Sequence, residues 1–423
     1  MANRELGDID DSVRLEVNGL EVKIAESYEV KVSVLQQPAA FSLRTGWGGT
    51  VAELRKQVTP GMTFGLFVGD VQVQSGRIDA VNVPDGKTSQ IEIKGRDWTQ
   101  VLFKSSILDE VSFSQRTFYD VTLKVLEICG LADHSLFGYN DANRQMMTHA
   151  ETKIVATQTP ASDQISAQET GVTEAGDVQT VTTQTLRAKV GETWWQWLQR
   201  QYKLAGIYLW CTHDGSFVIS SPDPNQQADY VIRVKRDQTK INTNIISGQL
   251  TNDATNRYAL YIVNGRYGAG QGGRGRYVGE FADFEMVNWG FTEPYVIYDQ
   301  DVKSQKQAEY RARRECAEHR RAGWNLHYTM AGHVVPQQYQ QGNIANWGPD
   351  LIAEVDDEER GITDNMYLEA VTFARSLDAG TTTRIELMRA QDMQWLAEDL
   401  SETMKKDRKV LGGGSTLPKG GRH

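Results

Sequence analysis

Short alternating strands joined by tight turns fill the first hundred residues, and this pattern constrains the fold most. Apolar and polar residues alternate in 13–17 and in 20–24, and Asn18-Gly19 between them is the strongest short signal for a β-hairpin. Further runs follow at a spacing of about ten residues: YEVKVSVL, FSLRT, FGLFVGDVQV, GRIDAVNV and SQIEIKG. We therefore expect a β-barrel or sandwich over residues 10–103, preceded by an N-terminal arm of residues 1–9.

The pattern changes after residue 103. Residues 117–130 (TFYDVTLKVLEICG) have helical spacing and end in a glycine, so residues 104–142 are predicted to be a helical connector. Residues 143–185 contain no aromatic residue and are rich in Thr, Gln and Ala. Because such a composition buries little apolar surface, we expect this segment to be an extended insertion or long loop.

A compact module is predicted at residues 186–234. Thr193 and Gln196 fit a capping box at the start of a helix, and Gly206 suits the left-handed position after its end. Two apolar runs, 207–211 and 217–220, then flank an Asp-Gly turn and predict a hairpin. The module is therefore a small helix-hairpin unit.

The last large region, residues 235–395, is again rich in strand patterns and contains one long helix. That helix is expected at 304–322, with a capping box from Ser304 and Gln307 at its start and Gly323 after its end. Ala308, Ala312 and Cys316 form a stripe of small residues on it, suited to close packing.

Trp324 to Met330 read as the next strand, with Trp324, Leu326, Tyr328 and Met330 on its apolar face. Residues 396–423 end in Gly, Ser and Lys and are expected to be a flexible C-terminal tail. The predicted fold class is mainly β with α/β insertions.

Composition narrows the function. With 423 residues, two to four domains of about 150 residues are expected. Lys and Arg number 45 against 55 Asp and Glu, a net charge of -10, which argues against a surface that grips phosphates. Cys129, Cys211 and Cys316 are scattered, so no disulfide framework is implied. The start lacks an apolar signal segment, and no run of about 18 apolar residues predicts a membrane span.

One segment has the residue types of a metal site. Cys316, His319, His327 and His333 lie close in sequence, and zinc takes four such ligands. However, four arginines crowd the same turns, and a histidine in the last turn of a helix is explained by the helix dipole. We therefore favour structural roles for the four residues and expect no metal and no cofactor.

Other motifs give no catalytic site. GAGQGG at 268–273 matches G-x-G-x-x-G after a strand, but no helix pattern follows, so a mobile basic loop is expected. DDEE at 356–359 is interpreted as a solvated loop. No hydrolase, zinc-protease or P-loop motif occurs, and the chain is predicted not to be an enzyme.

Tryptophans gather in the helix-hairpin module, at positions 194, 195, 197 and 210. Helical spacing predicts that most of them pack in a core, with Trp195 as the candidate for an exposed ring. Exposed tryptophans stack on sugars, so a glycan- or peptidoglycan-binding module using Trp194 to Trp210 is the alternative function.

Three stretches carry a family resemblance. GRDWTQVLFKSS at 95–106 resembles the stretch that closes the first barrel in baseplate hub proteins of contractile-tailed, Mu-like bacteriophages, which are related in fold to the T4-type tail hub. Residues 192–222 are similar to the helix-hairpin module of that family. ARRECAEHRRAGWNLHYTMAGH at 312–333, with NIANWGPDLIAEV and GTTTRIELM, resembles its last barrel. Together the matches cover most of residues 10–390 in the family's order.

The resemblance implies a homotrimer with two tube-like β-barrels per chain, at 10–103 and 235–395, arranged in a pseudo-sixfold ring. Such a ring adapts the sixfold tail tube to the threefold central spike and leaves a channel for the tape measure protein and for DNA. The implied partners are other copies of the chain, the spike, the tail tube or distal tube initiator, the tape measure protein and the baseplate wedge proteins. The implied location is the virion, with the host cytoplasm during assembly.

Overall fold

The structure is a computed structural model. It describes residues 12–23, 26–46, 56–83, 90–114, 117–138, 149–152, 170–172, 178–180, 182–203, 206–235, 245–265, 277–299, 302, 305–335, 340 and 347–397. The predicted N-terminal arm, most of the predicted insertion at 143–185 and the tail from residue 398 lie outside these ranges.

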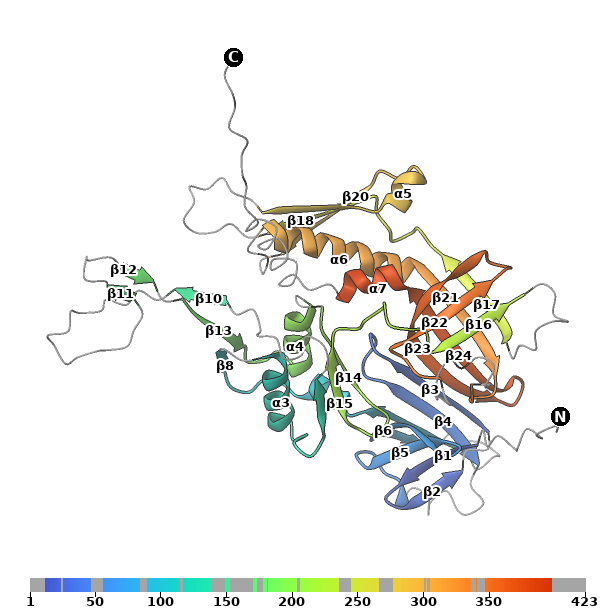
Figure 1. Cartoon of the computed structure of the whole chain (residues 1–423). Coiled ribbons are helices and arrows are strands. Elements are labelled where there is room, and N and C mark those ends of the chain that lie inside the picture. Colours follow the sequence, from blue (N-terminus) through green and yellow to red (C-terminus); the bar gives the residue numbers. More distant parts are fainter. Residues whose placement is uncertain are drawn as a thin grey trace.

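Strands predominate over helices, as the sequence predicted (Figure 1). The helices are α2 (Thr99–Lys104), α3 (Phe118–Ile128), α4 (Trp194–Lys203), α5 (Phe284–Asn288), α6 (Gln305–Gly323) and α7 (Ala390–Ala397). The strands of the first half are β1 (Val13–Val17), β2 (Leu20–Lys23), β3 (Ser27–Ser33), β4 (Ala40–Gly46), β5 (Thr63–Val68), β6 (Val71–Asn82), β7 (Gln90–Asp97), β8 (Val111–Ser114), β9 (Leu136–Gly138), β10 (His149–Thr152), β11 (Thr170–Val172), β12 (Val178–Thr180) and β13 (Thr182–Ala188). Those of the second half are β14 (Tyr208–Cys211), β15 (Phe217–Ser220), β16 (Tyr230–Val234), β17 (Ile245–Asn252), β18 (Leu260–Gly265), β19 (Val278–Ala282), β20 (Pro294–Asp299), β21 (Trp324–Ala331), β22 (Leu351–Asp357), β23 (Ile362–Ser376) and β24 (Gly380–Arg389).

The first hairpin forms as predicted. Val17 pairs with Leu20, and the turn residues Asn18 and Gly19 have φ angles of 49° and 80°. Both angles are positive, which is the backbone that a two-residue turn needs to match the twist of the strands. Asparagine and glycine adopt this conformation at little cost, so the turn sets the register of β1 and β2.

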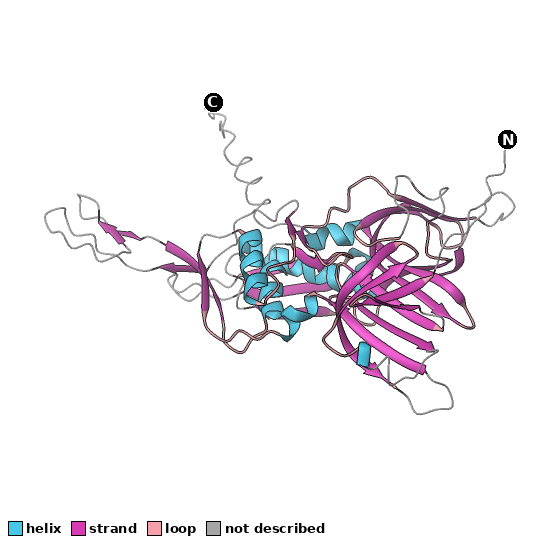
Figure 2. Ribbon diagram, turned by 90° about the horizontal axis from the view of Figure 1, so that it is seen from below, coloured by secondary structure: helices cyan, strands magenta, loops and turns pink. Residues whose placement is uncertain are grey.

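Most strands of both predicted barrels belong to one large sheet; β18, β19 and β20 of the second region form a sheet of their own. The large sheet has 13 strands, with the order β17-β21-β24-β23-β3-β4-β7-β6-β5-β1-β2, while β22 pairs with β23 and β16 pairs with β22. Figure 2 shows its strands at one end of the molecule, with the helices gathered beside them. Among the described strands the sheet does not close on itself, so the two-barrel arrangement stays a prediction.

Strands β3 and β23 connect the two halves. They pair antiparallel from Ser33 with Ala370 to Tyr28 with Arg375. A single hydrophobic core follows the sheet across this pair and contains Val30 and Phe41 as well as Phe373 and Leu387. The two strand-rich regions are therefore packed as one body, although they are far apart in sequence.

Asp97 lies where the first set of strands ends. It is buried, and its carboxylate accepts hydrogen bonds from the backbone N–H groups of Ala39, at 3.1 Å, and Thr99, at 3.0 Å. Burial raises the pKa of Asp97 to about 7, against the effect of these donors. Asp97 thus fixes the chain before β4 to the start of α2, within the segment that carries the first family motif.

The connector and the helix-hairpin module share a second core. Helix α3 begins at a capping box formed by Thr117 and Asp120 and ends before Gly130, whose φ is 73°. Helix α4 has the predicted capping box, in which Thr193 and Gln196 exchange hydrogen bonds at 3.2 Å. Strands β14 and β15 form the predicted hairpin, and β9 from the connector adds to it in parallel.

Part of the predicted insertion is in strands rather than loop. Strand β13 pairs with β10 and β8, and β11 pairs with β12. In Figure 1 these pairs project away from the helices. Within the described ranges, no helix has the length and apolar character required to cross a membrane.

Candidate assembly surface

Helix α6 supports a three-stranded sheet of order β19-β18-β20. Ala308, Ala312 and Cys316 are fully buried against this sheet, as the stripe of small residues predicted, and pack with Tyr261 and Val263. The approach is close: a Cβ atom at Gly279 would lie 2.0 Å from the carbonyl carbon of Ala308. Gly279 therefore allows the backbone of β19 to lie directly on α6.

The opposite face of this sheet is largely apolar and partly exposed. Strand pairing aligns Leu260 with Ala282 and Pro294, and it aligns Ile262 with Val296, so these side chains share one face. Val296 is 59% exposed and Tyr298 is 57% exposed. In Figure 1 this sheet lies on the far side of α6 from the rest of the fold. We call this the outer face; its residues are Leu260, Ile262, Val278, Glu280, Ala282, Pro294, Val296 and Tyr298.

More apolar side chains are exposed next to this sheet, in and after α5. They are Phe284, Val287, Trp289 and Phe291, and Phe284 is 70% exposed. Soluble proteins seldom expose so many large apolar side chains close together unless a partner covers them. The outer face and the α5 segment are therefore the candidate assembly surface.

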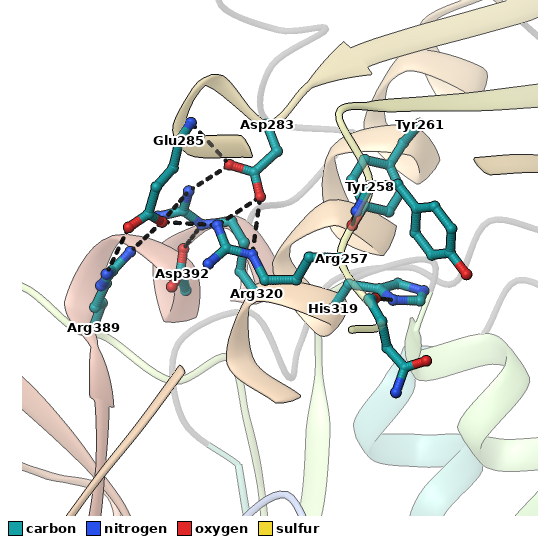
Figure 3. A network of polar contacts seen from close by, with 10 residues as sticks. Arg257, Tyr258, Tyr261, Asp283, Glu285, His319, Arg320, Arg389 and Asp392 are labelled. Atoms are coloured by element: carbon teal, nitrogen blue, oxygen red, sulfur yellow. Dashed lines mark hydrogen bonds and ion pairs between the residues drawn. The ribbon is translucent and has the colours of Figure 1, made fainter. Parts of the chain in front are cut away.

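A buried charge network holds this surface to the body of the protein (Figure 3). Asp283, the N-cap residue of α5, accepts two hydrogen bonds from Arg257, at 3.2 and 2.7 Å. Neither side chain is exposed to solvent. Arg257 also donates to Glu285 at 2.7 Å. Because an unpaired buried charge is costly, these contacts fix the start of α5 in one position.

The network continues into α6, α7 and the large sheet. Arg320 of α6 donates to Asp283 at 3.0 Å and to Asp392 of α7 at 2.6 Å. Arg389, at the end of β24, donates to Glu285 at 2.9 and 3.2 Å. Burial tends to raise the pKa of Glu285, but hydrogen bonds from Arg389 and Arg257 lower the pKa to about 2. Glu285 thus stays ionised and connects α5 to the large sheet.

The sequence did not predict this network, because its members come from four separate stretches of the chain. Two further arginines of α6 also bind within the chain. Arg321 donates to both oxygens of Glu369, at 3.0 and 2.7 Å. Arg314 is buried and donates to the hydroxyl of Tyr208 at 3.0 Å. The N-cap pattern at Asp283 was the one available signal for its position.

The four candidate metal ligands have separate partners. Cys316 lies in the core beneath β18, where burial raises the pKa of its thiol. His319 hydrogen-bonds the carbonyl of Asn256 and lies 3.7 Å from Glu315. Arg384 donates to His327 at 3.1 Å. No group of three or more His, Cys, Asp or Glu residues suited to a metal occurs within the described ranges.

His333 is fully buried and joins the two halves of the large sheet. Its Nε2 lies 2.6 Å from the hydroxyl of Tyr28 in β3, and its Nδ1 lies 2.9 Å from the hydroxyl of Thr383 in β24. Thr383 donates its own proton to the carbonyl of Gly332, so Nδ1–H donates and Nε2 accepts. Burial lowers the pKa of His333 to about 4, so the ring is neutral near pH 7.

The prediction of a solvated loop at 356–359 was wrong for Asp357. Its side chain is fully buried, receives the hydroxyl of Tyr328 at 2.6 Å and pairs with Arg360 at 2.7 Å. The carboxylate also accepts from the backbone N–H of Glu359, at 2.9 Å, which closes the turn between β22 and β23. Ser304 and the GAGQGG motif lie outside the described residues.

The tryptophans of the helix-hairpin module are buried. Trp197 has no exposed surface, and Trp194 packs edge-on against it at 5.9 Å. Trp195, the candidate for an exposed ring, is only 9% exposed and stacks on Phe103 at 4.4 Å. The helical spacing predicted the position of Trp195 on α4, but its contact with α2 could not be predicted from the sequence. The cluster therefore offers no exposed ring of the kind that the glycan-binding alternative assumed.

Comparisons with known proteins agree with the family resemblance. No protein-family model matches the chain, and a search of curated proteins found no match. The 43 kDa tail protein of prophage MuSo2 from Shewanella oneidensis has a similar structure over 90% of this chain and 99% of its own, with a TM-score of 0.70 and 18% identity. The tail protein from Neisseria meningitidis MC58 is similar over 91% of this chain and 98% of its own, with a TM-score of 0.67 and 18% identity. The chain has the fold of these phage tail proteins.

Proposed function

We propose that this chain is a structural baseplate or tail hub of a phage tail, without catalytic activity. The observation that carries the proposal is the shared fold with two phage tail proteins across nine tenths of the chain. In this role the protein belongs to the virion and is present in the host cytoplasm during assembly.

We further propose that three copies form a ring. Two tube-like β-barrels per chain, at 10–103 and 235–395, would give six barrels around one axis. When subunits contact one another head to tail, a closed ring leaves no contact surface unpaired. Such a ring fits between a sixfold tail tube and a threefold central spike. The candidate assembly surface exposes large apolar side chains to water, which is unfavourable. This exposure supports the proposal that other subunits cover the surface.

The channel of this ring is proposed to admit the tape measure protein and DNA. A net charge of -10 supports a lumen that repels phosphate rather than holding it. The remaining partners are the distal tube initiator and the baseplate wedge proteins. We propose that these proteins and the spike bind the exposed surfaces of the chain.

Native mass measurement and imaging of the purified protein test the ring. The expected result is a trimer with threefold symmetry and six similar densities around a channel. A stable monomer at micromolar concentration, in the presence of its spike, would contradict the ring. A monomer would contradict the ring but not the phage tail fold, because the similarity in fold concerns a single chain.

A further inference from the structure

The candidate assembly surface carries negative charge as well as apolar side chains. Residues 277–299, which run from β19 through α5 to β20, include five carboxylates and no lysine or arginine. Three of the five pair with arginines within the chain. The other two, Glu280 in β19 and Glu293 just before β20, are exposed. A segment that covers this surface therefore has to bring apolar side chains for the strands and cations for the two carboxylates.

The C-terminal segment of the chain has the complementary composition. Residues 403–411 (TMKKDRKVL) contain four cations and one carboxylate, together with Met404, Val410 and Leu411. Three glycines follow at 412–414. The segment lies outside the described residues. Opposite charges direct two surfaces toward each other and set which surfaces meet, so this composition favours the acidic outer face.

The described chain ends beside the sheet that carries the outer face. Trp395, in the last turn of α7, packs edge-on against Phe281 of β19, with the ring centroids 5.3 Å apart. Strand β19 is an edge strand of its sheet. Helix α7 ends at Ala397, so the chain continues from a point close to this edge. Residues 398–402 reach up to about 17 Å when extended, which is enough to pass around one strand.

Attachment to the same chain favours the contact further. The distance from β19 to β20 is about 10 Å, two strand spacings, and nine extended residues span about 30 Å. A short flexible linker gives an attached segment an effective concentration on the order of 1 mM. At that concentration a contact with a dissociation constant of about 0.1 mM is formed about nine tenths of the time. Weak charge pairs and a few apolar contacts are therefore sufficient.

A second copy's outer face is a less suitable cover. It would bring its own Glu280 and Glu293 and no cation from 277–299, and like charges disfavour such a contact. We propose that residues 403–411 cover the outer face of their own chain, with their lysines beside Glu280 and Glu293 and their apolar side chains on the strands. The segment shields the apolar surface before assembly. Its displacement by a binding subunit rests on the proposed function, whereas the contact itself does not.

Zero-length cross-linking of the full chain tests the contact directly. A carbodiimide joins a lysine amine to a carboxylate only where the two groups touch. In dilute protein the expected product is a monomer with an amide link from a lysine of 403–411 to Glu280 or Glu293, identified by mass spectrometry of its peptides. The double variant Glu280→Gln, Glu293→Gln should lose these links. Asp364→Asn, which changes an exposed carboxylate of β23, should keep them.

Binding of an apolar fluorescent dye measures whether the face is covered. The double variant Lys405→Glu, Lys406→Glu should bind more dye than the parent protein, because the carboxylates of the outer face repel the altered segment. The control Lys419→Glu, Arg422→Glu changes the net charge by the same amount beyond the three glycines and should bind dye like the parent. Circular dichroism confirms that each variant is folded.

Three results would overturn the proposal. They are no link between 403–411 and the outer face in the parent protein, equal dye binding by the parent and the Lys405→Glu, Lys406→Glu variant, or, in a mixture of isotope-labelled and unlabelled protein, links that join different chains. The last result would assign the face to the segment of another copy. A parent protein that forms the link but no trimer would contradict the ring and leave this contact in place.

Discussion

Arg320 donates from Nε to the carboxylate of Asp392 at 2.6 Å, and its Nη1 donates to Asp283 at 3.0 Å. One guanidinium therefore joins α6 to α7 and to the start of α5. The geometry suits arginine, whose planar group offers several fixed donors, better than lysine. Buried charged residues thus hold the candidate assembly surface in place, while its outer face is largely apolar.

Replacing Asp283 should destabilise the protein strongly. Asp283→Ala leaves Arg257 buried without one of its carboxylate partners and removes a contact of Arg320. Breaking a buried pair in this way costs about 3–5 kcal/mol in free energy of unfolding. Urea denaturation measures the loss. As a control, Glu127→Ala removes an exposed pair with Lys124 and should cost less than about 1 kcal/mol. Equal costs for the two variants would contradict a stabilising network.

Local signals predicted many elements correctly. The Asn18-Gly19 turn, the capping box of Thr193 and Gln196, and the alternation in β21 depend on residues close together in sequence. The pairing of β3 with β23 could not be predicted in this way, because neither strand carries a pattern that names its partner. The same limit applies to the site. Arg257, Asp283 and Asp392 are ordinary charged residues until the fold brings them together.

His333 should make stability depend on pH in acid. Its pKa falls from an ordinary value of 6.5 to about 4 in the folded protein, so the unfolded chain binds a proton first as the pH falls. Its contribution to stability is complete above pH 6.5 and is lost between pH 6.5 and 4, at up to about 1.4 kcal/mol per pH unit. His333→Gln should flatten this slope, measured by urea denaturation at several pH values. The exposed His213→Gln should keep the parent slope, and a parent slope in His333→Gln would contradict the assignment.

Gly279 should tolerate no side chain. In Gly279→Ala the new methyl group would lie 2.0 Å from the carbonyl carbon of Ala308, so β19 must move away from α6. Overpacking of this kind costs about 1–3 kcal/mol, seen as a lower midpoint in thermal unfolding. Gly348→Ala is the matched control, since its nearest side-chain atom is 3.9 Å away. If both variants unfold at the same temperature, the close contact between β19 and α6 is not formed.

A charge on the outer face should prevent assembly without unfolding the chain. Val296 is 59% exposed, so Val296→Asp leaves the core intact but adds a carboxylate that a covering subunit would have to desolvate. If this face is a contact between copies, the variant should be monomeric under conditions where the parent protein is a trimer, as measured by native mass spectrometry. Thermal unfolding of the monomer should be unchanged.

Leu377→Asp provides the matched control for that experiment. Leu377 is 84% exposed at the turn between β23 and β24, away from the outer face, so a carboxylate there should leave the trimer intact. If Val296→Asp still forms trimers, the outer face does not lie between copies and is left for the spike or a wedge protein. A trimer in both variants would therefore contradict the outer face as the contact between copies, but it would not contradict the ring. A parent protein that is itself monomeric would contradict the ring directly.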